Sequence, residues 1–235
     1  MNSPKKLARI AGVLYLLVAI IGPFVLLYVP GKLFVRGDAA ATAANILNHE
    51  TLFRSYIALG ILSELLFIST VLALYLLLKE KGPLLAKAMV ITILIDAPLA
   101  FLSSANQIAT LAFVRGADIL SVFDKPQRDA LATLLIQIDG HGVLVSEVFW
   151  GLWLLPLGIL ILRSGMIPRF IGYWVIVNGI AYIVSGFTGI LLPEFSAIVG
   201  KVSLPILFGE LALALWLLIM GVKLPAAETP TPEHA

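Results

Sequence analysis

The sequence predicts an all-α, polytopic membrane protein with six transmembrane helices arranged as three hairpins. Hydrophobic residues make up 60% of its 235 residues and charged residues only 13%, whereas soluble globular domains contain about 45–50% apolar and about 25% charged residues. Six apolar runs have about the length, roughly 20 residues, that crosses about 30 Å of hydrocarbon. Two longer polar connections between these runs predict two short interfacial amphipathic helices on the outer side.

Charge and cysteine content exclude several other classes of protein. The formal net charge of +2 is too small to indicate a nucleic-acid-binding surface. The chain has no cysteine, which excludes disulfides, thiolate metal sites and catalytic thiols. We therefore expect the lipid bilayer as a partner, and no nucleic acid.

The first transmembrane helix is predicted at residues 10–29. Ser3 and Pro4 provide an N-cap followed by a proline in the first turn. Three basic residues flank the apolar run: Lys5, Lys6 and Arg9. A signal peptide has a shorter apolar region, about 7–15 residues, followed directly by a small-residue cleavage site. The sequence after residue 29 does not resemble such a site, so we expect an uncleaved anchor.

The polar connection at residues 31–52 predicts the first interfacial helix. Asp38 is well placed to cap it. The residues expected on one apolar face are Ala40, Ala43, Ile46 and Leu47. A helix with such a face is typical of an interface between a polar and an apolar phase.

The second and third spans are predicted at residues 53–78 and 84–114. The turn between them is tight, so the two helices should be antiparallel neighbours. The second span carries Arg54 near its outer end and Glu64 in its interior. The second half of the third span is unusually polar, with Asp96, Pro98, Ser103, Ser104, Asn106 and Gln107. We expect this helix to face protein or water rather than lipid.

A second long polar connection is predicted at residues 115–142. Asp124 and Pro126 mark the start of an amphipathic helix. Its apolar stripe consists of Leu131, Leu134, Leu135 and Ile138. We expect this second interfacial helix to end in a glycine-flanked bend at residues 139–142.

The remaining spans are predicted at residues 143–162, 170–192 and 204–222. In the fifth span, Ser185 and Gly189 have the four-residue spacing that lets helices approach closely. Residues 1–223 should therefore form a single transmembrane domain. The tail at residues 224–235 is rich in Pro, Thr and Glu and is predicted to be disordered.

The distribution of basic residues predicts the orientation. Nine of the 16 Lys and Arg residues lie on the side of the N-terminus, in short segments, and seven lie on the other side, in longer ones. Basic residues in short loops mark the cytoplasmic side. We therefore expect both termini in the cytoplasm.

Three glutamates interrupt the even-numbered spans: Glu64, Glu147 and Glu210. An ionised side chain in the centre of a span costs roughly 2.5–3.5 kcal/mol on insertion scales. Each glutamate lies 13–16 residues before the basic residue that follows its span, which puts all three about 20–24 Å from the cytoplasmic edge. They should share one layer. Partial similarities between the loops and between the odd-numbered helices favour three hairpins of common origin.

Intramembrane carboxyls commonly mark pathways for ions or protons. We therefore predict a cavity, open to the outside, that binds a proton, a cation or another small solute. The candidate residues are Glu64, Asp96, Asn106, Asp139, His141, Glu147 and Glu210. Asp96 is expected below the glutamates, with Asp139 and His141 at the mouth. In the alternative interpretation, each glutamate is hydrogen-bonded across helices and serves only packing.

The sequence contains no familiar metal, cofactor or catalytic motif. His141 precedes Glu147 by six residues, which is not the helical spacing of a ligand pair. We therefore predict no metal, no cofactor and no catalytic residue.

Binding and translocation of a small solute, cation or proton is the favoured function. The alternatives are a non-catalytic membrane partner or sensor that uses residues 38–50 and 126–138, and, ranked last, an intramembrane enzyme with Asp139, His141 and Glu147 as acid and base groups.

Several longer stretches resemble one family of membrane proteins. They are residues 37–46 (GDAAATAANI), 139–142 (DGHG), 149–158 (FWGLWLLPLG), 163–169 (RSGMIPR) and 209–217 (GELALALWL). Together they are similar to the bacterial multi-pass family catalogued as the domain of unknown function numbered 4386, over about residues 6–223. The resemblance implies a bacterial inner-membrane protein. It supplies no established activity, substrate or catalytic residue.

Overall fold

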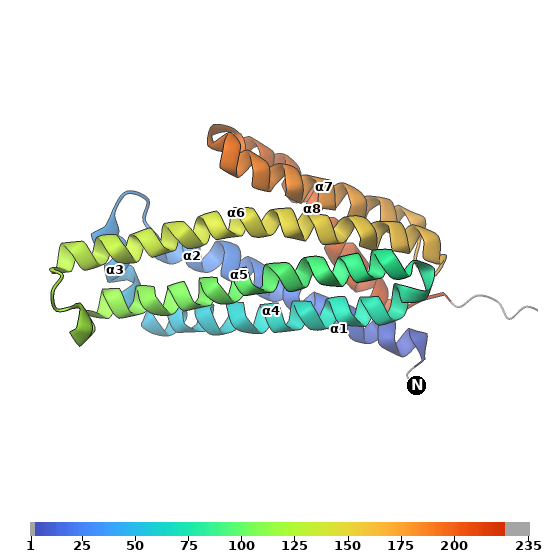
Figure 1. Cartoon of the computed structure of the whole chain (residues 1–235), viewed down its shortest axis with the longest axis horizontal. Helices are drawn as coiled ribbons and strands as arrows, with labels where there is room; N and C mark the ends of the chain where they lie inside the picture. Colours follow the sequence, from blue (N-terminus) through green and yellow to red (C-terminus); the bar gives the residue numbers. More distant parts are fainter. Residues whose placement is uncertain (1–2, 224–235) are drawn as a thin grey trace, which may run out of the picture.

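The computed structural model describes residues 3–223, and within this part of the chain six helices are long and apolar enough to cross a membrane (Figure 1). This confirms the all-α, polytopic fold class. The tail predicted to be disordered, residues 224–235, lies outside the described residues.

The helices follow one another with short connections. Their bounds are α1 Pro4–Pro23, α2 Val29–Leu33, α3 Ala39–Asn48, α4 Glu50–Leu78, α5 Pro83–Arg115, α6 Lys125–Ser164, α7 Arg169–Leu191 and α8 Ser196–Ile219. A π-helical turn, Phe24–Tyr28, joins α1 to α2. It follows Pro23, which has no backbone N–H to complete a regular α-helical turn, and α1, the turn and α2 together form the first span.

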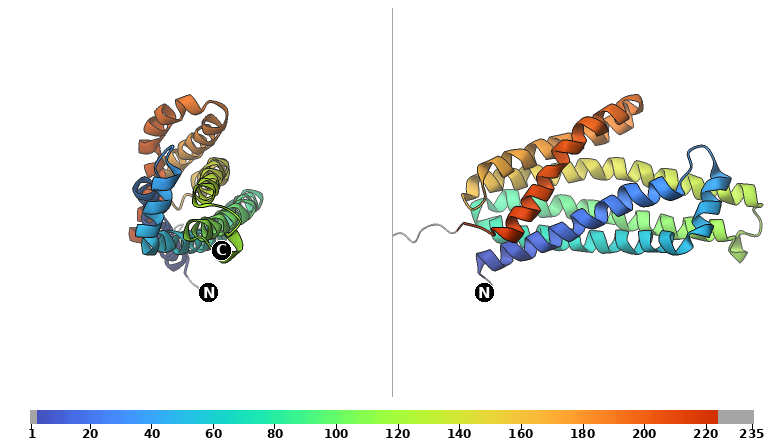
Figure 2. Two further views of the ribbon diagram at one scale, coloured as in Figure 1. Left: turned by 90° about the vertical axis from the view of Figure 1, so that its left-hand side faces the viewer. Right: turned by 180° about the vertical axis from the view of Figure 1, so that it is seen from behind.

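Three helical hairpins make up the molecule, as the sequence predicts. Helix α1 packs against α4, α5 against α6 and α7 against α8. Neighbouring hairpins contact each other: α4 packs against α5, and α6 packs against α7. Helix α8 also packs against α1 (Figure 2). The six spans therefore form a closed ring around a shared interior.

The largest difference from the sequence-based prediction is in α6, which is a single helix of 40 residues. Its start is as predicted, with Asp124 as N-cap in a capping box with Gln127. The predicted bend at residues 139–142 is wrong, and the second interfacial helix is not separate but forms the first part of α6. Gly140 and Gly142 do not have positive φ angles. Packing against α5 keeps this segment helical, although glycine costs about 1 kcal/mol in a helix interior.

Helix lengths divide the molecule into two parts. Helices α5 and α6 are about 50 and 60 Å long, whereas α7 and α8 are only about 35 Å. The α5–α6 hairpin therefore projects beyond the α7–α8 hairpin at one end (Figure 1). We call the projecting part, residues 29–57 and 106–139, the head. The remainder, residues 4–28, 58–105 and 140–219, is the membrane bundle.

Each part has its own hydrophobic core. The core of the membrane bundle receives side chains from all six spans, among them Tyr15, Leu74, Met89, Trp153, Val175 and Leu217. The core of the head includes Leu33, Ile46, Phe53, Val114 and Ala132. The head is therefore a packed unit and not a set of loose loops.

Helix α3 belongs to the core of the head. Asp38 caps it as predicted, accepting a hydrogen bond of 2.8 Å from the Ala41 backbone N–H. The predicted apolar face is only partly right, because Ala43 and Ile46 are buried whereas Ala40 and Leu47 are exposed. Helix α3 packs against α4, α5 and α6, and these contacts select which of its faces is covered.

Glycines allow α6 and α7 to pack with their backbones in contact. A Cβ atom on Gly151 would lie 2.4 Å from the carbonyl oxygen of Gly179, and one on Gly186 would lie 2.6 Å from that of Leu144. The predicted close approach at Gly189 is confirmed, since its Cβ would meet the Leu144 side chain at 2.5 Å. Small residues at such an interface permit close van der Waals packing in lipid.

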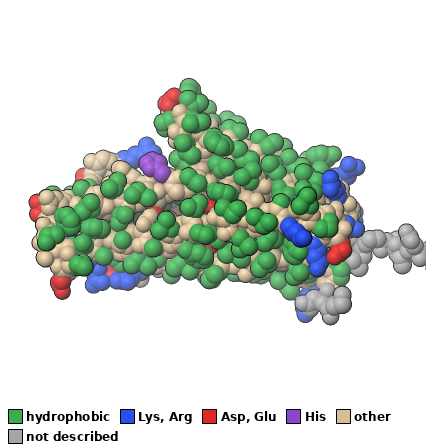
Figure 3. Space-filling view, in the orientation of Figure 1, with side chains coloured by type: hydrophobic (Ala, Val, Ile, Leu, Met, Phe, Trp, Pro, Cys, Tyr) green, Lys and Arg blue, Asp and Glu red, His purple; other side chains and the backbone are tan. Residues whose placement is uncertain are grey.

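The surface is divided in the way expected for a protein that crosses a bilayer. Hydrophobic side chains cover the middle of the face in Figure 3, and Lys, Arg, Asp and Glu gather toward the two ends. Arg54 lies near one end, where its Nε is 2.7 Å from Glu50 Oε1. The apolar middle is the surface that lipid would cover.

Candidate functional site

Four carboxyl side chains from four helices lie in the membrane bundle. We call Glu64 of α4, Asp96 of α5, Glu147 of α6 and Glu210 of α8 the carboxyl layer. Glu64 is 8% exposed and Asp96 is 1% exposed. Glu147 and Glu210 are partly buried. Because these helices form a closed ring, the layer occupies its interior rather than the lipid-facing surface.

Asp96 is the neighbouring carboxyl of Glu64. Its Oδ2 accepts a hydrogen bond of 2.9 Å from the Trp150 indole N–H, and the Ser146 hydroxyl lies beside it. Asp96 Oδ1 and Glu64 Oε1 are buried without a hydrogen-bond partner among the described residues. The expectation that Asp96 lies below the glutamates is wrong: it stands beside Glu64, at the same distance of 15 residues from the turn between α4 and α5.

Glu210 is held by side chains from two other helices. The Tyr15 hydroxyl of α1 donates a hydrogen bond to its Oε2. The Asn178 side-chain amide of α7 donates one of 3.2 Å to its Oε1, and the Tyr182 hydroxyl lies against the same carboxyl. Neither tyrosine was predicted from the sequence. For Tyr182 the sequence does contain a signal, because Asn178 and Tyr182 are four residues apart and therefore share a face of α7.

Glu147 lies close to the Glu210 side of the layer. Ser185 of α7 is beside it, and its Oε2 is buried without a partner in the part of the chain that the structure describes. Tyr182 is next to both Glu147 and Glu210. The Tyr182 and Trp150 rings are in edge contact, with centroids 5.8 Å apart. These two aromatic residues connect the Asp96 side of the layer to the Glu210 side.

A second polar cluster lies in the head. The Asn106 side-chain amide donates a hydrogen bond of 3.2 Å to Asp139 Oδ1, and the Gln107 amide donates one of 3.1 Å to the Tyr56 hydroxyl. Tyr56 is itself a neighbour of Asp139. Asp139 precedes Glu147 by eight residues, or about 12 Å along α6.

The seven predicted site residues therefore separate into groups. The structure brings Glu64, Asp96, Glu147 and Glu210 together in the carboxyl layer and joins Asn106 to Asp139 in the head. His141 is exposed and belongs to neither group. The separation arises because α6 is unbroken: residues 139 and 141 point to different sides of one helix, and Asp139 lies about 12 Å along that helix from Glu147.

Comparison with known proteins identifies the family but not an activity. The profile of the family described as "Domain of unknown function (DUF4386)" matches residues 10–221. The chain belongs to the DUF4386 family. It is also similar to an uncharacterized protein of Archaeoglobus fulgidus, with 32% identity over 80 residues, which are 34% of this chain and 46% of that protein. The match therefore spans less than half of the relative. No solved structure matches.

The carboxyl layer of this DUF4386 protein is not neutralised by basic side chains in the described residues. The ion pairs found between residues 3 and 223 join Glu50 to Arg54 and Arg115, and Asp129 to Lys125. All of them lie in the head. Within the same residues, no three His, Asp or Glu side chains are grouped so as to hold a metal ion. The chemistry available in the layer is thus that of carboxyls with hydroxyl, indole and amide donors.

Proposed function

We propose that this DUF4386 protein binds protons at its carboxyl layer and uses that binding to move protons or a small cationic solute across the membrane. The observation that carries the proposal is the Glu64–Asp96 pair. Each member has a buried oxygen without a partner among the described residues. Two ionised carboxylates near each other in an apolar interior repel each other. A proton bound by either carboxyl, or a monovalent cation bound near both, removes that repulsion.

The surroundings of the layer supply groups that exchange protons with it. The Tyr15 and Tyr182 hydroxyls contact Glu210, and Tyr182 also adjoins Glu147. Chains of intramembrane Asp, Glu and His side chains form the proton relays of pumps and transporters, and a hydroxyl group can pass a proton between two carboxyls by donating one hydrogen bond and accepting another. The Trp150–Tyr182 contact allows a change at Asp96 to alter the position of the groups around Glu210.

Access to the layer requires helix movement, because Asp96 is almost completely buried. Helix α7 stays packed against α6 as far as Gly189, whereas α8 meets α1 near its C-terminal end and diverges from α1 toward the α7–α8 turn (Figure 2). The Tyr15–Glu210 hydrogen bond joins these two helices. A movement of α8 away from α1 would break that bond and expose Glu210, which links the protonation of the layer to a change of shape.

Proton flux into vesicles tests the proposal directly. Purified full-length protein is reconstituted in liposomes containing a pH-sensitive dye, and a membrane potential is imposed. We expect faster acidification than in protein-free vesicles, and we expect Glu64→Gln and Asp96→Asn to remove the difference. Glu194→Gln is the matched control, since Glu194 is exposed in the α7–α8 connection. Equal rates with and without the wild-type protein would reject proton translocation.

A second candidate function is that of a non-catalytic membrane partner or sensor. It is favoured by the tip of the head, where Ile119 is 87% exposed and Val122 is 81% exposed. Large apolar side chains at such a position suit contact with another protein. A photo-crosslinking amino acid at position 119, used in native membranes, tests this function. Failure to recover a stable product would count against it and would leave the flux experiment unaffected.

We also propose that the protein resides in the bacterial cytoplasmic membrane with both termini in the cytoplasm. The proposal rests on the higher density of Lys and Arg near the ends of the spans on the N-terminal side. The head is then on the outer side.

A further inference from the structure

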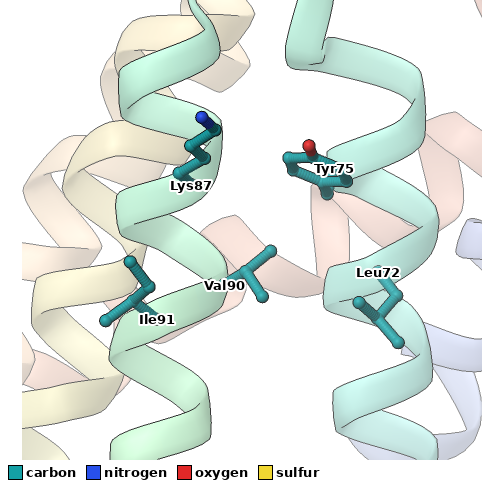
Figure 4. Close-up of a pocket in the computed structure, with 5 residues that line it drawn as sticks. All are labelled: Leu72, Tyr75, Lys87, Val90 and Ile91. Atoms are coloured by element: carbon teal, nitrogen blue, oxygen red, sulfur yellow. The ribbon is translucent and has the colours of Figure 1, made fainter.

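A groove lies between α4 and α5, and no member of the carboxyl layer lines it. It contains a pocket of about 190 Å³ lined by Leu72 and Tyr75 of α4 and by Lys87, Val90 and Ile91 of α5 (Figure 4). A smaller pocket shares Leu72 and Val90 and continues along both helices to Ile68 and Leu94. Together the two pockets form an elongated groove with a polar and an apolar end.

The groove opens toward lipid. Leu72, Ile91 and Leu94 are 45%, 55% and 52% exposed although they lie in transmembrane helices. Apolar side chains at this depth are exposed only where lipid covers them. The natural occupant of the apolar end is therefore a hydrocarbon chain.

The other end of the groove is polar and basic. Figure 4 shows the Lys87 amine and the Tyr75 hydroxyl at the same end of the pocket, one on each side of it. The turn that joins α4 to α5, Lys79–Lys81, adds two more lysines against one glutamate, Glu80. The ion pairs found in residues 3–223 are all in the head, so Lys87 has no carboxylate partner within the described chain.

The depth of Lys87 matches that of a lipid headgroup. It lies four residues after Pro83, the first residue of α5, which is about 6 Å along the helix. Lysines at such positions extend along apolar surface and place the ammonium at the interface. Basic pockets between transmembrane helices at the membrane surface are known to bind anionic headgroups.

We propose that this groove binds one anionic phospholipid from the leaflet next to the Lys79–Lys81 turn. Its phosphate accepts hydrogen bonds from the Lys87 ammonium and the Tyr75 hydroxyl. One acyl chain lies along Leu72 and Val90 toward Leu94. The site is independent of the proposed proton function, because no member of the carboxyl layer lines the groove.

Native mass spectrometry of the detergent-solubilised full-length protein tests the site. We expect the first phosphatidylglycerol to bind several-fold more tightly than phosphatidylcholine with the same acyl chains. Lys87→Gln should reduce phosphatidylglycerol binding about fivefold, the effect of one basic residue near an anionic surface. Lys201→Gln is the matched control, since Lys201 is exposed in α8 at the opposite end of the bundle, and it should retain the preference.

Two further measurements define the occupant. Val90→Trp fills the groove and should weaken both lipids, whereas inorganic phosphate should not displace phosphatidylglycerol, because it has no chain to occupy the apolar end. Equal binding of the two lipids by the wild-type protein would overturn the proposal. So would an unchanged preference in Lys87→Gln, unchanged binding in Val90→Trp, or displacement by phosphate.

Discussion

The Tyr15 hydroxyl donates a hydrogen bond to the Glu210 carboxylate, although the two residues are 195 positions apart in the chain. One turn before Tyr15, a Cβ atom on Gly12 would lie 2.5 Å from the Leu218 backbone nitrogen. The first and last spans therefore meet at a point where a polar contact and a close backbone contact occur together. This meeting closes the ring of six helices.

Removal of the Tyr15 hydroxyl should weaken the closure of the ring. We expect Tyr15→Phe to lower the free energy of unfolding by about 0.6 kcal/mol, the average measured for hydrogen bonds within a membrane bundle, and by no more than about 1.7 kcal/mol, the largest value measured. Unfolding in mixed micelles, followed by circular dichroism, provides the measurement. Tyr173→Phe is the control, because Tyr173 is 54% exposed in α7. Identical curves for the two variants would show that the Tyr15 hydrogen bond does not stabilise the fold.

A methyl group at Gly151 should separate α6 from α7. The Cβ of Gly151→Ala would lie 2.4 Å from a backbone oxygen of α7, so one helix has to move. We expect a loss of about 1–3 kcal/mol in the free energy of unfolding. Gly140→Ala, in the same helix, meets nothing within 4 Å and should be neutral or stabilising by up to about 1 kcal/mol. A smaller loss of stability at position 151 than at position 140 would contradict the close contact between α6 and α7 at Gly151.

The continuity of α6 can be measured as a distance. Leu134 and Leu152 are exposed and lie 18 residues apart, which corresponds to about 27 Å in an unbroken helix. Because the chain contains no cysteine, spin labels attach only to cysteines introduced at these two positions. Double electron–electron resonance should give one distance near this value. A much shorter distance would show that the chain bends at residues 139–142 and that α6 is not continuous.

The protonation of the carboxyl layer should be visible by infrared spectroscopy. If one proton neutralises either Glu64 or Asp96, a protonated carboxyl band persists at neutral pH in reconstituted membranes. Asp96→Asn and Glu64→Gln should each alter or remove this band, because each destroys the pair. Glu80→Gln should not, since Glu80 is exposed in the α4–α5 turn. A wild-type spectrum without such a band at neutral pH would argue against proton binding by the pair.

The proposed orientation predicts which cysteines react from outside the cell. Val122→Cys, at the exposed tip of the head, should react with a membrane-impermeant maleimide in intact cells. Lys81→Cys, in the α4–α5 turn at the other end, should react only after the membrane is permeabilised. The reverse pattern would place both termini outside.

Much of the architecture could be predicted from the sequence because it depends on local properties. The length of each apolar run sets the number of spans, and the caps at Asp38 and Asp124 fix the starts of α3 and α6. The layer of Glu64, Glu147 and Glu210 follows from helical rise and alternating direction alone. The prediction was less successful where a local pattern competes with packing, as at Gly140 and Gly142, which lie inside a helix.

The sequence by itself determined that the chain crosses the membrane six times as three hairpins and that three of its spans carry glutamates at similar depth. Only the tertiary structure decided which side chains contact these glutamates. Tyr15 reaches Glu210 and Trp150 reaches Asp96 because of the rotation of each helix and the choice of its neighbours. The tertiary structure likewise placed Asp139 next to Asn106 in the head, apart from the carboxyl layer. Hydrophobic length and caps act within a few turns of one segment, whereas partners across helices are selected by the packing of the whole ring.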